Sequence, residues 1–273
     1  MTKRVLTGAA FALLVLAGVL LKGWVMFTLI SLAMVVSTFE MYRAIRATAI
    51  EPVRWAGYLF CAACILAQGA GLYLSRDLHL SMYALLLSVM AAIICLVMRG
   101  KVAVDSLMAT LLPMLYPGIF YLTLMDLLRL ENRAVITVAL VLAFFCASIN
   151  DVFALFTGML LGKHKLSPIL SPKKTVEGGV GGLLGGVLGM MLLHAVGSRI
   201  LGSSFLSWGQ ILALGLLGSV IDQIGDLSFP VIKREFGVKD YGKLLPGHGG
   251  VLDRFDSVTF VAPFAYLLSA LLG

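Results

Sequence analysis

The sequence has little charge. Asp, Glu, Lys and Arg make up 13% of its 273 residues, whereas about 25% is usual in a soluble domain. No polar segment is longer than roughly 30 residues, so no separate soluble domain fits between the apolar runs. With a hydrophobic share of 60% and a mean hydropathy of +1.01, this shortage excludes an ordinary soluble protein and indicates a helical membrane protein.

Cysteine and histidine are also scarce, with four residues of each. Cys61 and Cys64 have the spacing of a redox or metal-binding pair, but no second pair accompanies them and both lie inside an apolar run. We interpret them as two small residues of a membrane helix. No cluster of Cys and His offers a zinc site.

Acidic residues are outnumbered by basic ones, and the net charge is +7. Such a balance can indicate nucleic-acid binding. In a membrane chain, however, basic residues orient the helices and contact anionic lipid headgroups. We therefore expect membrane lipid as a partner and no nucleic acid.

Apolar runs dominate what is present, and nine of them are candidate membrane spans. They cover residues 5–21, 24–39, 55–74, 80–98, 107–128, 134–161, 176–196, 208–227 and 251–272. The first two are short and could form a tight or re-entrant hairpin. The first is similar to a signal peptide, but other spans follow directly, so we expect it to be retained. The predicted fold class is an all-α polytopic membrane protein of about nine transmembrane helices, in one domain covering residues 1–273.

The distribution of basic residues predicts the orientation of the chain. With a cytoplasmic N-terminus, sixteen of the 21 Lys and Arg residues fall in cytoplasmic segments and five fall outside. The C-terminus then lies outside, and the two most polar loops, 162–175 and 228–250, share the cytoplasmic side. One site built from both loops requires such a shared face.

Glycine gathers in the predicted span 176–196, where two ladders of glycines have four-residue spacing. The ladders are Gly178, Gly182 and Gly186, and Gly181, Gly185 and Gly189. Such ladders let helix backbones approach closely in lipid. We expect tight packing against a neighbouring helix or against a partner chain, which makes a homodimer one of the two outcomes. In the span 107–128, Pro113 and Pro117 predict a kink.

Pairs of acidic residues stand at the ends of the last two spans. Asp222 and Asp226 are four residues apart, and Asp253 and Asp256 are three apart, so each pair shares a helix face. Carboxylates in membrane helices are costly and usually functional. Oxygen ligands suit Mg²⁺, which binds one or two carboxylates together with substrate phosphates. Salt bridges to bases of the same stretch, such as Arg254, are the alternative.

Basic residues fill both polar loops. They include Lys233, Arg234 and Lys239 in one loop and Lys173 and Lys174 in the other. Arg binds phosphate oxygens through its forked guanidinium, and Lys acts as a point charge. The two loops can therefore gather several phosphate charges.

Three further polar features stand near these loops. The turn at 246–250 could offer backbone N–H groups as an anion-binding nest. His248 in that turn could act as an acid, a base or a phosphate donor. Asp151 follows Asn150 inside an apolar run, where a lysine of loop 162–175 is a candidate partner and a structural contact between helices is the alternative.

Carboxylates, bases and an apolar helical body together predict phosphoryl or nucleotidyl transfer at the membrane face, with a lipid as one substrate. Such transfer depends on positioning and charge neutralisation more than on a protein nucleophile. A metal ion and basic side chains supply both.

One long spaced pattern in the C-terminal half is highly specific. It reads Lys233-Arg234-x4-Lys239-Asp240-x-Gly242-x2-Leu245-Pro246-Gly247-His248-Gly249-Gly250-x2-Asp253-Arg254-x-Asp256. With the upstream segment 171–178 and Asp151, it closely resembles the signature of the phosphatidate cytidylyltransferases (CDP-diacylglycerol synthases). The N-terminal half adds only hydropathy to this resemblance.

The resemblance implies the reaction CTP + phosphatidate → CDP-diacylglycerol + pyrophosphate, with one or two cations, Mg²⁺ first. It implies Asp226, Asp253 and Asp256 as metal ligands, with Asp222 as a weaker candidate, and catalytic roles for these three acids, Lys174 and Lys233. The substrate-binding residues that it implies are Lys173, Lys174, Lys233, Arg234, Lys239, Asp240, His248, Gly249, Gly250, Arg254 and Asp151. Residues 1–130 would then pack the helices and wall a lipid cavity. Residues 131–273 would form the catalytic half, in the cytoplasmic (inner) membrane with the site facing the cytoplasm.

The chain departs from the family pattern at one place. After Gly225-Asp226-Leu227 the family usually has an acid, and then a serine three residues before the Lys-Arg pair. Here Phe229 and Pro230 occupy these positions, so the serine hydroxyl is missing. Proline, which lacks an N–H, would bend or end the helix there.

Two other classes of protein fit part of the pattern. A CTP-dependent polyprenol or lipid kinase would have a similar membrane architecture and also bind CTP. An ion-coupled transporter would use acids at the membrane midplane, but here the charge gathers at one face and no inverted repeat is visible.

Overall fold

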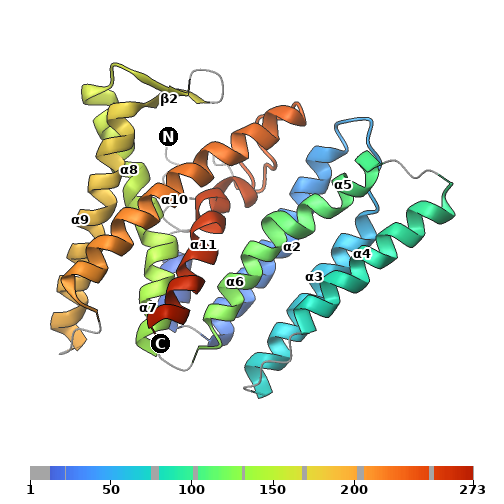
Figure 1. Cartoon of the computed structure of the whole chain (residues 1–273), viewed down its shortest axis with the longest axis horizontal. Helices are drawn as coiled ribbons and strands as arrows, with labels where there is room; N and C mark the ends of the chain where they lie inside the picture. The colour runs from blue at the N-terminus through green and yellow to red at the C-terminus, as the bar shows by residue number, and fades with distance from the viewer. Residues whose placement is uncertain are drawn as a thin grey trace. The chain divides into compact units, whose positions relative to one another are not determined.

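The computed structural model describes residues 13–21, 23–74, 80–100, 104–130, 133–167, 171–201, 206–245 and 249–272. These residues form helices and one two-stranded antiparallel sheet (Figure 1). The predicted all-α class is thereby confirmed. The chain divides into two compact units of two segments each. Unit 1 is Met1–Arg129 with Ile232–Phe255, and unit 2 is Leu130–Val231 with Asp256–Gly273.

Unit 1 is built from helices that pack around α2. Its elements are α2 (Gly23–Ile45), α3 (Arg54–Leu74), α4 (Leu80–Met98), α5 (Val104–Pro113), the π-helical turn η1 (Met114–Gly118) and α6 (Ile119–Leu127). Met26, Ile30, Met34, Met41 and Ile45 of α2 are all fully buried. Their spacing places them on one stripe of the helix, which is the pattern of a core-facing side.

Buried hydroxyl groups connect α2 to the helices around it. The Ser37 hydroxyl lies 2.8 Å from the Tyr121 hydroxyl of α6, and the Tyr42 hydroxyl donates a hydrogen bond of 2.7 Å to the Thr110 carbonyl of α5. Polar side chains in apolar bundles need such partners, since no water is present to replace them. The contacts therefore fix how these helices meet.

The predicted kink at Pro113 and Pro117 is confirmed. α5 ends at Pro113 and η1 follows, with Tyr116 at the non-helical angles φ −142° and ψ 109°. Neither proline can donate a backbone hydrogen bond, so the helical ladder is interrupted at this point.

Unit 2 holds the remaining elements and the sheet. They are α7 (Arg133–Val141), the π-helical turn η2 (Leu142–Cys146), α8 (Ala147–Leu161), β1 (Lys165–Ser167), β2 (Ser171–Thr175), α9 (Val176–Leu201), α10 (Trp208–Glu235) and α11 (Leu252–Leu272). The last residues of α10 and the first of α11 belong to unit 1. The polar loop predicted at 162–175 contains the sheet, in which Ser167 pairs with Ser171.

Five of the six ladder glycines of α9 face α8, and Gly186 faces Ser219 of α10. A Cβ atom at Gly178 would lie 2.8 Å from the Ala154 carbonyl oxygen, and one at Gly189 would lie 2.6 Å from Ile149 Cδ1. Only glycine allows the two backbones to come this close. Tight packing on a neighbouring helix is therefore confirmed, and a homodimer stays a prediction.

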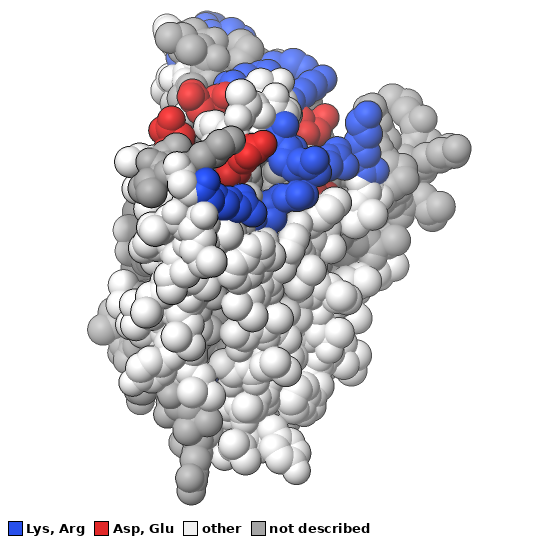
Figure 2. Space-filling model, turned by 90° about the vertical axis from the view of Figure 1, so that its right-hand side faces the viewer, with Lys and Arg blue, Asp and Glu red and all other residues white. Residues whose placement is uncertain are grey.

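Seven of the described helical segments are long and apolar enough to cross a membrane. They correspond to the second through eighth predicted spans. The first span lies partly outside the described residues, and the last corresponds to α11, which is not one of the seven. On the face drawn in Figure 2, charged side chains gather at one end and the described surface below them is uncharged. These features describe an integral membrane protein, while the count of nine spans and the sides of the termini stay predictions.

Replacing Gly182 by Leu should force α8 away from α9. A Cβ atom at Gly182 already lies 3.0 Å from Ala154 Cβ, and overpacking of this kind costs about 1–3 kcal/mol. The thermal unfolding midpoint of the detergent-purified variant should fall. Gly197→Leu on the same helix is the control, because a Cβ there meets nothing within 4 Å. Equal midpoints for the two variants would contradict this packing.

Candidate functional site

The predicted site residues lie in two polar clusters, one in each unit. We call the group around the cavity of unit 2 the cavity cluster and the group around Asp253 in unit 1 the loop cluster. Each is described within its own unit below.

The cavity cluster surrounds a hollow of about 500 Å³, a size typical of small-molecule sites. Its polar lining comes from three elements. These residues are Asn150 and Asp151 of α8, Lys173 and Lys174 of β2, and Gln223 and Asp226 of α10. Gly178 and Gly179 of α9 and apolar residues of α8 complete the wall. Four residues predicted to bind substrate or metal are thus brought together, namely Asp151, Lys173, Lys174 and Asp226.

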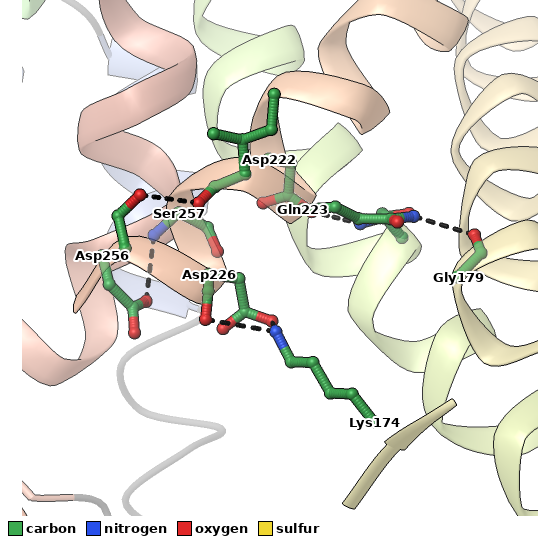
Figure 3. Close-up of polar contacts among 10 residues, drawn as sticks. Lys174, Gly179, Asp222, Gln223, Asp226, Asp256 and Ser257 are labelled. Carbon is green, nitrogen blue, oxygen red and sulfur yellow. Dashed lines mark hydrogen bonds and ion pairs between the residues drawn. The ribbon is translucent and has the colours of Figure 1, made fainter. Parts of the chain in front are cut away.

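An ion pair joins two of these residues. The Lys174 ammonium contacts the Asp226 carboxylate and also lies 3.2 Å from the Asp226 carbonyl oxygen (Figure 3). Both side chains are about one quarter exposed. At the end of an apolar helix the carboxylate needs a compensating charge, and Lys174 supplies it to Asp226.

The position of Lys174 follows from the start of α9. Thr175 directly precedes the helix, and its hydroxyl accepts a hydrogen bond of 3.1 Å from the Gly178 N–H. Threonine is a favoured N-cap because its hydroxyl satisfies an unpaired N–H of the first turn. β2 therefore ends at Thr175. Just before this end, Lys173 is exposed and Lys174 is half-buried, and both line the cavity.

A second polar network lies on α8, α9 and α10. The fully buried Asp222 accepts a hydrogen bond from the Asn150 amide. Gln223 donates to the Asn150 side-chain oxygen at 3.1 Å and to the Gly179 carbonyl at 2.8 Å (Figure 3). Asn150 thus makes a structural contact between α8 and α10, and the partner of Asp151 stays a prediction. Asp222, the weaker metal candidate, is not among the residues that line the cavity.

Asp256 lies at the start of the α11 segment of unit 2. Its carboxylate accepts a hydrogen bond of 2.9 Å from the Ser257 N–H, and Ser257 lies between Asp256 and Asp222 in Figure 3. Asp222, Asp226 and Asp256 thus approach one region from α10 and α11.

The loop cluster of unit 1 centres on Asp253, whose side chain is 4% exposed. One carboxylate oxygen lies 2.9 Å from Lys233 Nζ. The other accepts hydrogen bonds from the backbone N–H groups of Tyr241 at 2.9 Å and Gly250 at 2.8 Å. Lys233 also lies 5.5 Å from the centre of the Tyr241 ring, within the range of a cation–π contact. The basic partner of Asp253 is therefore Lys233, and a salt bridge of Asp256 with Arg254 stays a prediction.

Glu40 of α2 supports the same segment from the other side. Its two carboxylate oxygens accept hydrogen bonds from the backbone N–H groups of Val251, at 3.1 Å, and Leu252, at 2.9 Å. These N–H groups belong to the start of α11, where helix donors lack partners and a negative charge is favoured. Glu40 therefore caps a helix that begins 212 residues later in the chain.

Three glycines make room for these two carboxylates. A Cβ atom at Gly242 or Gly250 would collide with the Glu40 carboxylate, and one at Gly249 would lie 2.8 Å from Asp253 Oδ2. Gly249 also has φ +85°, in the left-handed region that glycine adopts without strain. At Gly250 the anion held by the turn is a protein carboxylate, so the nest predicted for a substrate phosphate is wrong for this N–H.

The remaining predicted site residues lie at the surface where the structure describes them. Arg234, Lys239, Asp240 and Arg254 are exposed, and His248 lies outside the described residues. α10 continues through Pro230 to Glu235, so the helix does not end there. Phe229 is fully buried, which shows that the position of the family's acid is here part of the core.

The donor set of the cavity cluster fits a hard cation. Across the described part of the chain, no group of three or more His, Cys, Asp or Glu side chains is placed to hold a metal. Mg²⁺, however, needs only one or two carboxylates when substrate phosphates complete its shell. Asp226 and Asp151 offer carboxylate oxygens to the cavity, so a metal could be held there together with a phosphate ligand.

Comparison with known proteins agrees with the motif. The sequence profile of the cytidylyltransferase family matches residues 2–272, and the chain therefore belongs to this family. The phosphatidate cytidylyltransferase of Thermotoga maritima is 42% identical over 122 residues, which is 45% of each chain. Those of Staphylococcus saprophyticus and Staphylococcus aureus are both 43% identical, over 126 and 127 residues, which is 46% of each chain. The matches span about half the length of these relatives, and the family predicted from the motif is confirmed.

Sequence reasoning missed Glu40 because it read the N-terminal half as hydropathy alone. A signal was present, since Glu40 is an acid between Phe39 and Met41 in an apolar run, and an acid within a membrane helix calls for a partner. The partner itself could not be found from the sequence. Gln223 was also missed, because its contacts to Asn150 and Gly179 form only when the helices pack together.

Replacing Glu40 by Ala should loosen the start of α11. The buried Leu252 N–H and the half-buried Val251 N–H would lose a charged acceptor, which costs roughly 2–3 kcal/mol. Hydrogen–deuterium exchange should accelerate at the Val251 and Leu252 amides, and the unfolding midpoint should fall. Glu235→Ala, an exposed acid of α10, is the control. Unchanged exchange at both amides in Glu40→Ala would show that the cap does not hold the helix.

Proposed function

We propose that this protein transfers the cytidylyl group of CTP to phosphatidate, with Mg²⁺, and releases CDP-diacylglycerol and pyrophosphate for phospholipid synthesis. Membership of the cytidylyltransferase family supports the nucleotide chemistry. The lipid acceptor is supported by the names of the relatives, which are phosphatidate cytidylyltransferases. Seven apolar helices provide the membrane setting that such a lipid requires.

The cavity cluster is the observation that carries this proposal. Lys173 and Lys174 place two positive charges at the cavity, and Asp151 and Asp226 place two carboxylates there. A basic and acidic lining in an otherwise apolar helical unit suits a triphosphate bound with a cation. A site for a purely apolar ligand would need neither the lysines nor the carboxylates.

The reaction needs no protein nucleophile, because the phosphate of phosphatidate already carries an anionic oxygen. This oxygen forms a bond to the α-phosphorus of CTP. The bond from that phosphorus to the oxygen bridging the β-phosphate breaks, and pyrophosphate leaves with the electron pair. The two anionic reactants repel each other, so the lysines of the cavity lower the barrier by neutralising charge.

Mg²⁺ held by Asp226 and Asp151 would add Lewis-acid stabilisation of the phosphate oxygens. The chain's own contribution is to keep Lys174 at the cavity through its pair with Asp226. A cation that is already held in place requires little reorganisation when substrate charge arrives.

For unit 1 we propose the roles that the family resemblance implies. Lys233, Arg234 and Lys239 bind phosphate, and Asp253 holds Lys233 at 2.9 Å for this purpose. Asp253 also remains a proposed metal ligand, as does Asp256, because an ionised carboxylate has about four acceptor positions. The proposed location is the cytoplasmic membrane, with both polar loops on the cytoplasmic side.

Replacing Asp226 by Asn should lower pyrophosphate release at least about 100-fold, as loss of one charged transition-state contact typically does. The assay uses purified protein with CTP, phosphatidate and Mg²⁺, and removal of Mg²⁺ by a chelator should abolish the signal. Lys165→Gln is the control, since Lys165 is exposed on β1 and does not line the cavity. Wild-type rates in a folded Asp226→Asn variant would refute this site.

Labelled CTP separates the proposed reaction from a lipid kinase. Cytidylyl transfer should carry label from the α-phosphate into the lipid and label from the γ-phosphate into pyrophosphate. A kinase would instead put the γ label into the lipid product. Neither outcome is expected from a transporter, which would leave CTP intact.

A further inference from the structure

A second cavity, which we call the arginine cavity, lies wholly in unit 1. It has a volume of about 690 Å³ and shares no lining residue with the cavity of unit 2. The residues that matter here are Arg46, Glu51, Arg54, Trp55, Tyr58 and Arg99. The proposed cytidylyl transfer assigns no role to any of them.

The three arginines come from separate parts of the chain. Arg46 follows the end of α2, Arg54 begins α3, and Arg99 follows the end of α4. Three helix ends therefore bring three guanidinium groups to one cavity. Glu51 is the one acid in the lining, so the formal charge of the cavity is positive.

Among the described residues, no carboxylate forms an ion pair with these three guanidinium groups. In the described part of the chain, no hydrogen bond or salt bridge engages the side chains of Arg46, Arg54 and Arg99. Elsewhere in this protein, Lys174 and Lys233 each have a carboxylate partner. Grouped and uncompensated guanidinium groups repel one another unless an external anion binds.

The wall of this cavity is ordered. The Val53 N–H donates a hydrogen bond of 2.8 Å to the Thr110 hydroxyl, and the Thr48 hydroxyl donates one of 2.6 Å to the Ile45 carbonyl. Val53 is fully buried. The turn between α2 and α3 therefore holds Arg46 and Arg54 in a defined relation, and an anion meets a preformed site.

The position of the cavity at the ends of apolar helices indicates its ligand class. It lies where three apolar spans end, and Trp55 and Tyr58 line it. Trp and Tyr are enriched at the level of lipid headgroups, and guanidinium groups match phosphate oxygens in a forked geometry. Large apolar residues such as Leu59 and Leu66 are exposed along α3 beside it, where acyl chains can lie.

We propose that the arginine cavity binds the phosphate headgroup of an anionic phospholipid, whose acyl chains follow the exposed side of α3. This site does not depend on the proposed cytidylyl transfer. Its ligand carries both a phosphate and acyl chains, and a soluble phosphate offers only the first of these.

Trp55 provides a direct probe of this binding. The chain has three tryptophans, so Trp24→Phe with Trp208→Phe leaves Trp55 as the one emitter. The protein is placed in bilayers that contain brominated phosphatidylglycerol or brominated phosphatidylcholine at equal mole fractions, and quenching of Trp55 is measured. The quenching measurement requires no catalytic activity, so its result is independent of the result of the enzyme assay.

We expect the anionic lipid to quench more strongly, with a relative association constant several-fold above that of phosphatidylcholine. Each of Arg46→Gln, Arg54→Gln and Arg99→Gln should reduce this preference about fivefold, the effect of one basic residue near an anionic surface. Arg43→Gln is the matched control, because Arg43 is an exposed arginine of α2 that does not line the cavity.

Three results would overturn the proposal. Equal quenching by both lipids would show that no anion is selected. An equal loss of preference in Arg43→Gln would show a diffuse surface potential rather than a site. Full displacement of the lipid by inorganic phosphate would assign the cavity to a soluble anion. Unfolding midpoints of all variants are measured alongside, so that a misfolded variant is not counted.

Discussion

Two carboxylates accept hydrogen bonds from the backbone N–H groups of the segment that leads into α11. Glu40 bonds to Val251 and Leu252, and Asp253 bonds to Gly250. A buried carboxylate and an unpaired N–H are each costly in an apolar bundle. When they meet, each satisfies the other, and the charged residues on either side of the segment are held with it.

The same constraint shapes unit 2. Asp226 is compensated by Lys174, and one carboxylate oxygen of Asp222 accepts a hydrogen bond from Asn150. In both units the acid is on a helix and its partner is brought by a different element. The charges needed for phosphate chemistry can therefore persist beside lipid, where isolated charges would be expelled or neutralised. The arginine cavity differs, since in the described part of the chain no ion pair engages its arginines, and we propose that an external anion binds there.

Glycine has a structural role in this protein beyond flexibility. On α9 the glycine ladders let α8 approach closely. In the segment before α11, Gly242, Gly249 and Gly250 leave space for the Glu40 and Asp253 carboxylates. The family motif therefore specifies the shape of a turn as much as its chemistry. The buried Phe229 and the uninterrupted α10 show that this chain accommodates a change within the motif by packing.

The sequence by itself determined the helical membrane class, the family, the kink at Pro113 and Pro117, and four charged residues of the cavity in unit 2, Asp151, Lys173, Lys174 and Asp226. These follow from local composition, from proline geometry and from a long spaced motif, all of which can be read along the chain. Only the tertiary structure decided which charges pair. Lys174 meets Asp226, Lys233 meets Asp253, and Glu40 meets a helix start 212 residues away. The choice among several nearby bases and acids depends on which helix faces pack together, and that packing is set by contacts distributed over the whole chain rather than by any one motif.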